Sequence, residues 1–163
     1  VIEGKAGFQI MGDWAKGEFT AAGKKPGVDY YCAATPSNNG YLYNVDSFIF
    51  YKSSDPDKQA GQKLLAKLMM GKNFQKVFNL YKGSIPARLD VSMDEFDKCA
   101  KTSNADIKTA GAKGGLVPSF AHGMAQGNTM KAALQDIITE HFNSDMSSKD
   151  AANALADSVL ANM

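Results

Sequence analysis

Strand signals in this chain are confined to the first 90 residues, and the rest is helical in pattern. Runs of β-branched and aromatic residues, bounded by glycine, proline or polar turns, predict strands over residues 5–12, 28–36 and 44–52. Their alternation with helical segments indicates an α/β protein. Three or four strands are too few for a self-sufficient doubly wound sheet, so part of the sheet is expected to lie elsewhere.

Caps and apolar periodicity mark the helices. Asp55 followed by Pro56 predicts a helix start, with an N-cap residue and a proline at the first helical position. That helix carries one apolar stripe, formed by Ala60, Leu64, Leu65, Leu68 and Met69. Ser147 and Asp150 predict the start of the last helix, in a capping-box pattern with aspartate in place of glutamate. The other helices are expected over residues 13–22, 73–81, 93–102, 104–113 and 129–142, and the last helix over 148–161. Turns are expected near 38–40 and 82–88, and a break between helices near 114–118.

Charge and hydropathy argue against two classes of partner. Eighteen Lys and Arg against seventeen Asp and Glu leave a net charge of +1, and no basic run is longer than Lys24-Lys25. Phosphate binding draws on clustered positive charge, so nucleic acid is not expected as a partner. No apolar segment approaches the roughly 20 residues that span a bilayer. The first residues lack an initiator methionine and a signal peptide, so we expect them to be internal to a longer protein.

The two cysteines, Cys32 and Cys99, leave two interpretations open. They are too far apart for a Cys-x-x-Cys redox pair or a zinc knuckle, and only His122 and His141 could add soft ligands. A structural metal is therefore not expected. A disulfide between them would be worth about 4 kcal/mol and would imply an oxidising compartment. The alternative is two independent buried thiols.

The single tryptophan, Trp14, follows Gly12 and Asp13 where the first predicted strand gives way to a helix. A lone tryptophan is commonly a core residue, and that interpretation stays open. Core tryptophans, however, usually belong to a periodic apolar face, which is missing here. At such a junction, where α/β sheets place their ligands, an indole can offer its ring face to the C–H face of a sugar.

Asp46 lies within a predicted strand, and alternation places it on the same face as Phe48 and Phe50. A carboxylate in such company must be paired, because an isolated buried charge costs several kcal/mol. One interpretation is an ion pair with Lys52 or another lysine. The other is a bidentate acceptor for two vicinal hydroxyl groups of a ligand.

Lys82 and His122 are the remaining candidate contacts. Lys82 precedes a glycine that lets backbone approach closely, although most lysines are solvated surface residues. His122 has apolar neighbours and is either a satisfied core histidine or a ligand contact. Arg88 is interpreted as part of a structural ion pair, and the eight methionines as core residues. No phosphate-binding loop, His-Glu-x-x-His helix, nucleophile elbow or Cys/His dyad is visible, so nucleophilic catalysis finds no support.

Six motifs occur in an order that resembles one protein family. They are GKAGFQIMGDWAKGEF, VDYYCAATP, VDSFIFYK, KVFNLYKGSIPARLDV, FDKCAKTS and LVPSFAHGMA. Together they resemble the periplasmic glucose-binding (glucose/mannose) proteins of bacterial ABC sugar importers, within the maltose-binding-like solute-binding family. The resemblance covers essentially the whole chain. It departs after Pro36, where the family commonly has Gly-Thr and this chain has Ser37-Asn38.

The resemblance implies a fold and a division of the chain. It identifies the chain as the carboxy-terminal part of a two-lobed periplasmic-binding-protein fold that is helix-rich after residue 90. Residues 1–29 and 82–163 would belong to the second lobe, and residues 30–81 to the first. The signal peptide and the amino-terminal portion of both lobes would be absent. This would account for the shortage of strands.

The same resemblance implies a function and a site. The family's sugar contacts that fall in this part of the chain match Trp14, Asp46, Lys82 and His122. They imply a non-enzymatic periplasmic protein that binds glucose or a close hexose by hinge closure, without a cofactor, and delivers it to the membrane permease of an ABC importer. The family pattern also implies a Cys32 to Cys99 disulfide. We expect the chain by itself to bind glucose weakly or not at all, and to need the missing amino-terminal portion, self-association or an altered fold to cover exposed apolar surface.

Two other function classes remain as alternatives. A glycoside-processing domain would need two carboxylates about 5 to 10 Å apart, and Asp13 with Asp46 is the plausible pair. A helical interaction module would leave Trp14 merely packed.

Overall fold

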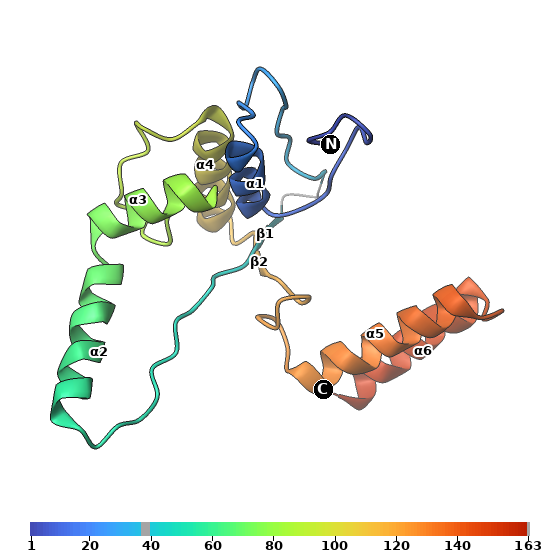
Figure 1. Ribbon diagram of the computed structural model, residues 1–163. Coiled ribbons are helices and arrows are strands. Elements are labelled where there is room, and N and C mark those ends of the chain that lie inside the picture. The colour runs from blue at the N-terminus through green and yellow to red at the C-terminus, as the bar shows by residue number, and fades with distance from the viewer. Residues whose placement is uncertain (37–39, 163) are drawn as a thin grey trace. The chain divides into compact units, whose positions relative to one another are not determined.

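The structure is a computed structural model that describes residues 1–36 and 40–162 (Figure 1). Its elements, in chain order, are η1 (Asp13–Ala15), α1 (Lys16–Ala21), β1 (Tyr41–Tyr43), α2 (Pro56–Met69), α3 (Lys72–Lys82), α4 (Lys98–Ala112), β2 (Leu116–Pro118), α5 (Asn128–Asn143) and α6 (Ser148–Ala161). They form two compact units. Unit 1 comprises residues 1–41 and 45–115, and unit 2 comprises residues 42–44 and those from 116 onward.

The predicted helices form where local signals mark them. The Asp55 carboxylate accepts hydrogen bonds from the amides of Asp57 (2.9 Å) and Lys58 (3.3 Å), and Pro56 is the first residue of α2. Ser147 accepts from the amide of Asp150 (3.1 Å), as the capping pattern at the start of α6 predicts. The helices expected over 13–22, 73–81 and 129–142 are also present, with ends within about two residues.

The two helices predicted over 93–102 and 104–113 are instead one helix, α4. It begins later than predicted because the Asp97 side chain caps it, accepting from the amide of Ala100 at 2.9 Å. Ser103 and Asn104 were interpreted as a boundary, but both lie inside the helix. Their weak helix propensity is overridden by the cap and by the burial of Ala100.

The three predicted strands are not strands in the structure. Residues 5–12, 28–36 and 44–52 are extended or irregular. Within the second of these segments, Tyr30 forms an isolated β-bridge with Pro26. Apolar side chains of the three segments point to solvent, with Phe8 95%, Tyr31 83% and Ile49 80% exposed. Strand propensity reflects packing against a neighbouring strand, and within the described residues these segments have no such neighbour.

The described residues form one small sheet, which the sequence did not predict. β1 and β2 are hydrogen-bonded neighbours. The amide of Tyr41 donates to the carbonyl of Gly115 and the amide of Ser119 donates to the carbonyl of Tyr43, both at 2.8 Å, which is a parallel register. The chain is therefore a mixed α/β protein. The turn predicted near 38–40, and the Ser37-Asn38 departure, lie outside the described residues except for Gly40.

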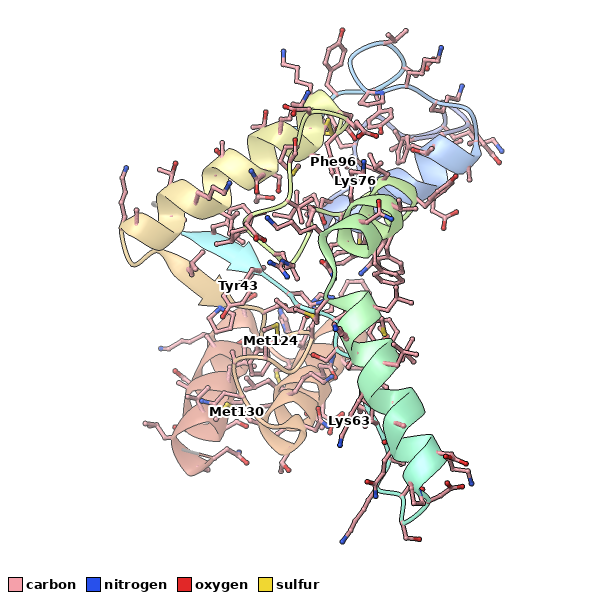
Figure 2. All side chains as sticks on the ribbon, turned by 90° about the vertical axis from the view of Figure 1, so that its left-hand side faces the viewer. Tyr43, Lys63, Lys76, Phe96, Met124 and Met130 are labelled. Atoms are coloured by element: carbon pink, nitrogen blue, oxygen red, sulfur yellow. A yellow bond between two sulfur atoms is a disulfide. The ribbon has the colours of Figure 1, made fainter. Side chains whose placement is uncertain are left out.

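The core of unit 1 lies where α1, α3 and α4 come together (Figure 1). Phe19 of α1 is buried and packs on Tyr30, with ring centroids 4.4 Å apart. The buried ammonium of Lys16 contacts both carboxylate oxygens of Asp97, at 2.9 and 3.1 Å. Lys76 of α3 donates to Glu95 at 2.7 Å, and Phe96, the residue after Glu95, is buried (Lys76 and Phe96 are labelled in Figure 2).

A disulfide joins Cys32 to Cys99, with a Cα–Cα distance of 5.6 Å. The bridge is the one that the family resemblance implies, and it rules out the interpretation of two independent thiols. It ties the irregular segment after Tyr30 to the first turn of α4.

Unit 2 contains a helical hairpin in which α5 and α6 pack side by side (Figure 1). Met130 of α5, labelled in Figure 2, and Ala151 of α6 are its buried residues. No helix in the described part of the chain is long and apolar enough to cross a membrane.

The expected apolar core is only partly formed. Of the stripe predicted on α2, Met69 is buried whereas Leu64, Leu65 and Leu68 are exposed. Among the described methionines, the interpretation as core residues is wrong for Met11, Met70 and Met124, which are exposed, and Met163 lies outside the described residues. The exposed side chains have no second layer of described residues to cover them.

Candidate functional site

The indole of Trp14 lies directly over the backbone of Gly12. A methyl group added to Gly12 would lie 2.1 Å from Cζ3 of Trp14, far inside van der Waals contact. Trp14 belongs to the short helix η1 and is half-buried. The glycine therefore leaves room for the ring against the main chain, and any larger residue at position 12 would displace the ring.

Lys82 and Asp46 form an ion pair. Lys82 is the last residue of α3, and its ammonium donates to Oδ2 of Asp46. The side chain of Lys82 is 30% exposed and that of Asp46 is 62% exposed, so the pair borders solvent. The lysine also lies over the ring of Phe78, 5.8 Å from its centroid. Two candidates chosen separately from the sequence thus meet, and the lysine that pairs with Asp46 is not Lys52.

The segment that carries Trp14 packs tightly on the segment that carries Lys82. A methyl group added to Gly17 would lie 2.8 Å from the carbonyl oxygen of Lys82, and one added to Gly83 would lie 2.6 Å from the amide nitrogen of Gly17. Gly83 ends α3 in the left-handed region, with φ of 88°. Glycine is needed at both positions because the two backbones touch there.

Side chains pin the turn that follows Lys82. Oδ2 of Asp13 accepts a hydrogen bond from the amide of Ile85 at 3.0 Å. Ser84 donates to Oδ1 of Asn79 at 2.9 Å, and the amide of Ala87 donates to Oε1 of Gln75 at 3.1 Å. The turn is thereby fixed both to α3 and to the start of the Trp14 helix.

His122 lies in unit 2, in a turn between β2 and α5. Its Nδ1 and the hydroxyl of Ser119 are 2.7 Å apart, and Ser119 is buried. Gly123 completes the turn with φ of 72°, its amide donating to the carbonyl of Phe120. The imidazole is exposed, so the interpretation of His122 as a core histidine is wrong. Trp14, Asp46 and Lys82 share unit 1.

Arg88 forms a structural ion pair, as the sequence predicts. Its guanidinium contacts both oxygens of Asp90, at 2.8 and 2.7 Å, and donates to the carbonyl of Met70 at 2.9 Å. The last bond caps the end of α2, and the arrangement lowers the pKa of Asp90. Within residues 1–36 and 40–162, no group of three or more His, Cys, Asp or Glu could hold a metal ion.

Sequence reasoning passed over Asp13 and Gly17 as parts of the scaffold. Asp13 was noted beside Trp14 and as one carboxylate of the glycoside-processing alternative, and Gly17 was not singled out. The pattern Gly-Asp-Trp-x-x-Gly was the available signal, since two glycines around a large ring indicate close backbone approach. The partner segment lies 72 residues away from Asp13, a distance that local sequence does not bridge.

We expect Gly83→Ala to lower the free energy of unfolding by about 2 kcal/mol. Alanine disfavours the positive φ of this residue, and its methyl group would collide with the amide nitrogen of Gly17. Urea denaturation of the chain measures the effect. Gly61→Ala is the matched control. Gly61 lies inside α2 with nothing within 4 Å of an added methyl group, so that substitution should stabilise by about 0.5 to 1 kcal/mol. Equal effects of the two substitutions would contradict the close approach.

Because burial raises the pKa of the Asp13 carboxyl, we expect the stability of the folded protein to depend on pH. Burial outweighs the opposing effects that the Ile85 amide and the charges of Lys16 and Lys82 have on this pKa. The folded protein binds this proton more tightly than the unfolded chain, so the stabilisation is complete below the ordinary carboxyl pKa and is lost as the pH rises through the raised pKa. We expect the Tm of the wild type relative to Asp13→Asn to fall as the pH rises above the ordinary carboxyl pKa of about 4 and through the raised pKa of Asp13. Thermal unfolding at several pH values measures this, and a constant difference would contradict it.

Comparisons with known proteins point to one functional class. No protein-family model matches the chain. The chain is 48% identical over 162 residues to a "Probable sugar-binding periplasmic protein" of Brucella suis, covering 99% of this chain and 38% of that protein. A protein of the same description from Rhizobium meliloti is 43% identical over 162 residues, covering 99% and 39%. An "Uncharacterized ABC transporter extracellular-binding protein" of Pyrococcus horikoshii is 36% identical over 166 residues, covering 99% and 36%. The chain thus spans less than two fifths of the length of these relatives.

Proposed function

We propose that the chain is part of the substrate-binding component of an ABC importer for a monosaccharide such as glucose, located in the periplasm. The observation that carries this proposal is the identity of 36 to 48% to sugar-binding and ABC extracellular-binding proteins over 99% of the chain. The geometry supports it, because Trp14 and the Lys82–Asp46 pair lie on segments that are packed together in unit 1.

Each proposed contact has a chemical role suited to a pyranose. The indole of Trp14 offers an apolar face to the C–H face of the ring. Asp46 accepts from two vicinal hydroxyl groups, and Lys82 and His122 donate. In the structure Lys82 donates to Asp46, and sugar hydroxyls placed between them would hydrogen-bond to both charged groups. The contact of Nδ1 with Ser119 orients the imidazole of His122.

Hinge closure is the proposed mechanism. Residues 30–81, with Asp46, would belong to the first lobe, and residues 1–29 and 82–163, with the other three contacts, to the second. A sugar held from both lobes binds the closed state more tightly than the open one, so it shifts the population towards closure. The membrane permease would recognise the closed, loaded state. The chain contributes binding and no catalytic step, and it needs no cofactor.

The enzyme alternative is disfavoured by how its two carboxylates are used. A glycoside-processing site needs both carboxylates at the scissile bond, whereas Asp13 is partly buried and its carboxylate accepts from the amide of Ile85. Release of a chromogenic group from aryl glycosides would separate a glycoside-processing domain from a binding protein. A helical interaction module would show tryptophan fluorescence that is indifferent to sugars.

The test uses a chimaera of the Brucella suis relative, in which this chain replaces the segment that it matches. Titration calorimetry with glucose, mannose, galactose and xylose measures binding, and the unmodified relative is the control for folding and activity. We expect saturable binding of at least one hexose. A chimaera that unfolds cooperatively and binds none of the four sugars would contradict the proposed function.

We expect the 163-residue chain by itself to bind glucose weakly or not at all and to self-associate. Phe8, Ile10, Ile49 and Phe142 are large apolar side chains that are more than three quarters exposed, and such surface favours association. Size-exclusion chromatography with light scattering, followed by glucose titration, measures both properties. A monomer that unfolds cooperatively and binds glucose as tightly as the chimaera would contradict this expectation.

A further inference from the structure

We propose that Asp13 is a positioning residue of the sugar site: by holding the turn after α3 against the start of the Trp14 helix, it fixes Lys82 relative to Trp14. The inference rests on the proposed function, because it concerns two of the proposed sugar contacts. It assigns to Asp13 a role other than contact with the sugar.

The hydrogen bond between Asp13 and Ile85 lies close to both Trp14 and Lys82 in sequence. Oδ2 of Asp13 accepts from the amide of Ile85 at 3.0 Å, and the two residues are 72 apart in sequence. Asp13 directly precedes Trp14 in η1, and Ile85 follows Lys82 by three residues. The hydrogen bond therefore joins the segment that carries Trp14 to the segment that carries Lys82, within three residues of each contact.

Close packing alone does not fix the orientation of the Lys82 segment on the Trp14 segment. Gly17 and Gly83 allow the two backbones to touch, but glycines supply contact without direction. A hydrogen bond is directional, because the N–H of the donor must point at the acceptor oxygen. Asp13 thus supplies the directional restraint where the glycines supply the space.

The restraint depends on the position of the acceptor oxygen of residue 13 rather than on its charge. The carboxylate lies near the ammonium groups of Lys16 and Lys82, and burial works against its ionised form. An amide oxygen at the same place would accept the same bond from Ile85 without that burial cost. The role therefore requires an acceptor at the distance that an aspartate or asparagine side chain reaches.

Three substitutions separate position from charge. Asp13→Asn keeps the acceptor and removes the charge, Asp13→Glu keeps the charge and moves the acceptor by one methylene, and Asp13→Ala removes both. We expect asparagine to behave like the wild type and glutamate to behave like alanine. Glu18→Ala is the control, since it removes an exposed carboxylate from α1, the helix that follows η1.

Two readouts on the chain report position directly. Trp14 is its single tryptophan, so fluorescence emission and acrylamide quenching report this ring alone. We expect red-shifted emission and stronger quenching in Asp13→Ala and Asp13→Glu, but not in Asp13→Asn or Glu18→Ala. Hydrogen exchange at the Ile85 amide should quicken by about tenfold or more in the same two variants.

Glucose affinity of the chimaera completes the test. We expect Kd to rise about tenfold in Asp13→Ala and Asp13→Glu, and to stay within about threefold of the wild type in Asp13→Asn. Unchanged emission, exchange and Kd in Asp13→Ala would overturn the inference while the proposed function stands. Equal losses in Asp13→Asn and Asp13→Ala would also overturn it. If the unsubstituted chimaera binds no sugar, the proposed function fails, and the role of Asp13 in a sugar site fails with it.

Discussion

Replacing both cysteines, Cys32→Ser with Cys99→Ser, is expected to lower the free energy of unfolding of the chain by about 4 kcal/mol. The bridge spans 67 positions in sequence, and a cross-link over so long a loop strongly restricts the unfolded chain. The loss is large compared with the total stability of a domain, which is about 5 to 15 kcal/mol.

The surroundings of the bridge add a reason for a large effect. The segment around Cys32 forms no strand, so regular backbone pairing does not hold it in place. Its other anchor described above is the packing of Tyr30 on Phe19. At the other end, Cys99 lies in the first turn of α4, beside the ion pair of Lys16 with Asp97.

Urea denaturation with and without a reducing agent measures the contribution of the disulfide. The wild type under reducing conditions should resemble the double variant, and the reducing agent should leave the double variant unchanged. A loss below about 1 kcal/mol would show that the bridge is not a main tether of unit 1.

Asp46→Ala is expected to weaken glucose binding by the chimaera about tenfold to over a hundredfold. The substitution removes the acceptor of two charge-assisted hydrogen bonds. It also leaves the Lys82 ammonium, now 30% exposed and paired with Asp46, without that carboxylate. Titration calorimetry measures the change, and Asp46→Asn should show an intermediate loss because it keeps one acceptor oxygen.

Asp57→Ala is the matched control, since it removes an exposed carboxylate from the first turn of α2. The single variants Asp46→Ala and Lys82→Ala, together with the double variant, form a double-mutant cycle. If both side chains contact the sugar, the double loss should be smaller than the sum of the single losses, because each single variant also breaks the ion pair. An affinity unchanged by Asp46→Ala would remove Asp46 from the site.

The helices could be predicted because their signals are local. Asp55 with Pro56, and Ser147 with Asp150, fix a helix start within four residues of sequence, and the structure has both starts. The strands could not, because a strand is defined by its partner. Residues 44–52 have a strand-like alternation but pair with no neighbouring strand among the described residues, whereas the three residues of β1 pair with β2 across more than 70 positions.

The candidate site divides in the same way. Local context singled out Trp14, as a lone tryptophan at a predicted strand-to-helix junction, and Lys82, which precedes a glycine that allows close approach. The pairing of Lys82 with Asp46 and the bond from Ile85 to Asp13 are long-range, so they are visible only in the structure. The disulfide was left open by its spacing and was implied by the family resemblance alone.

A crystal structure of the chimaera with bound glucose tests the central claim most directly. We predict one pyranose stacked on the Trp14 ring, with Asp46, Lys82 and His122 each within about 3.2 Å of a sugar oxygen. A sugar bound elsewhere, or these four side chains on unrelated surfaces, would contradict the account.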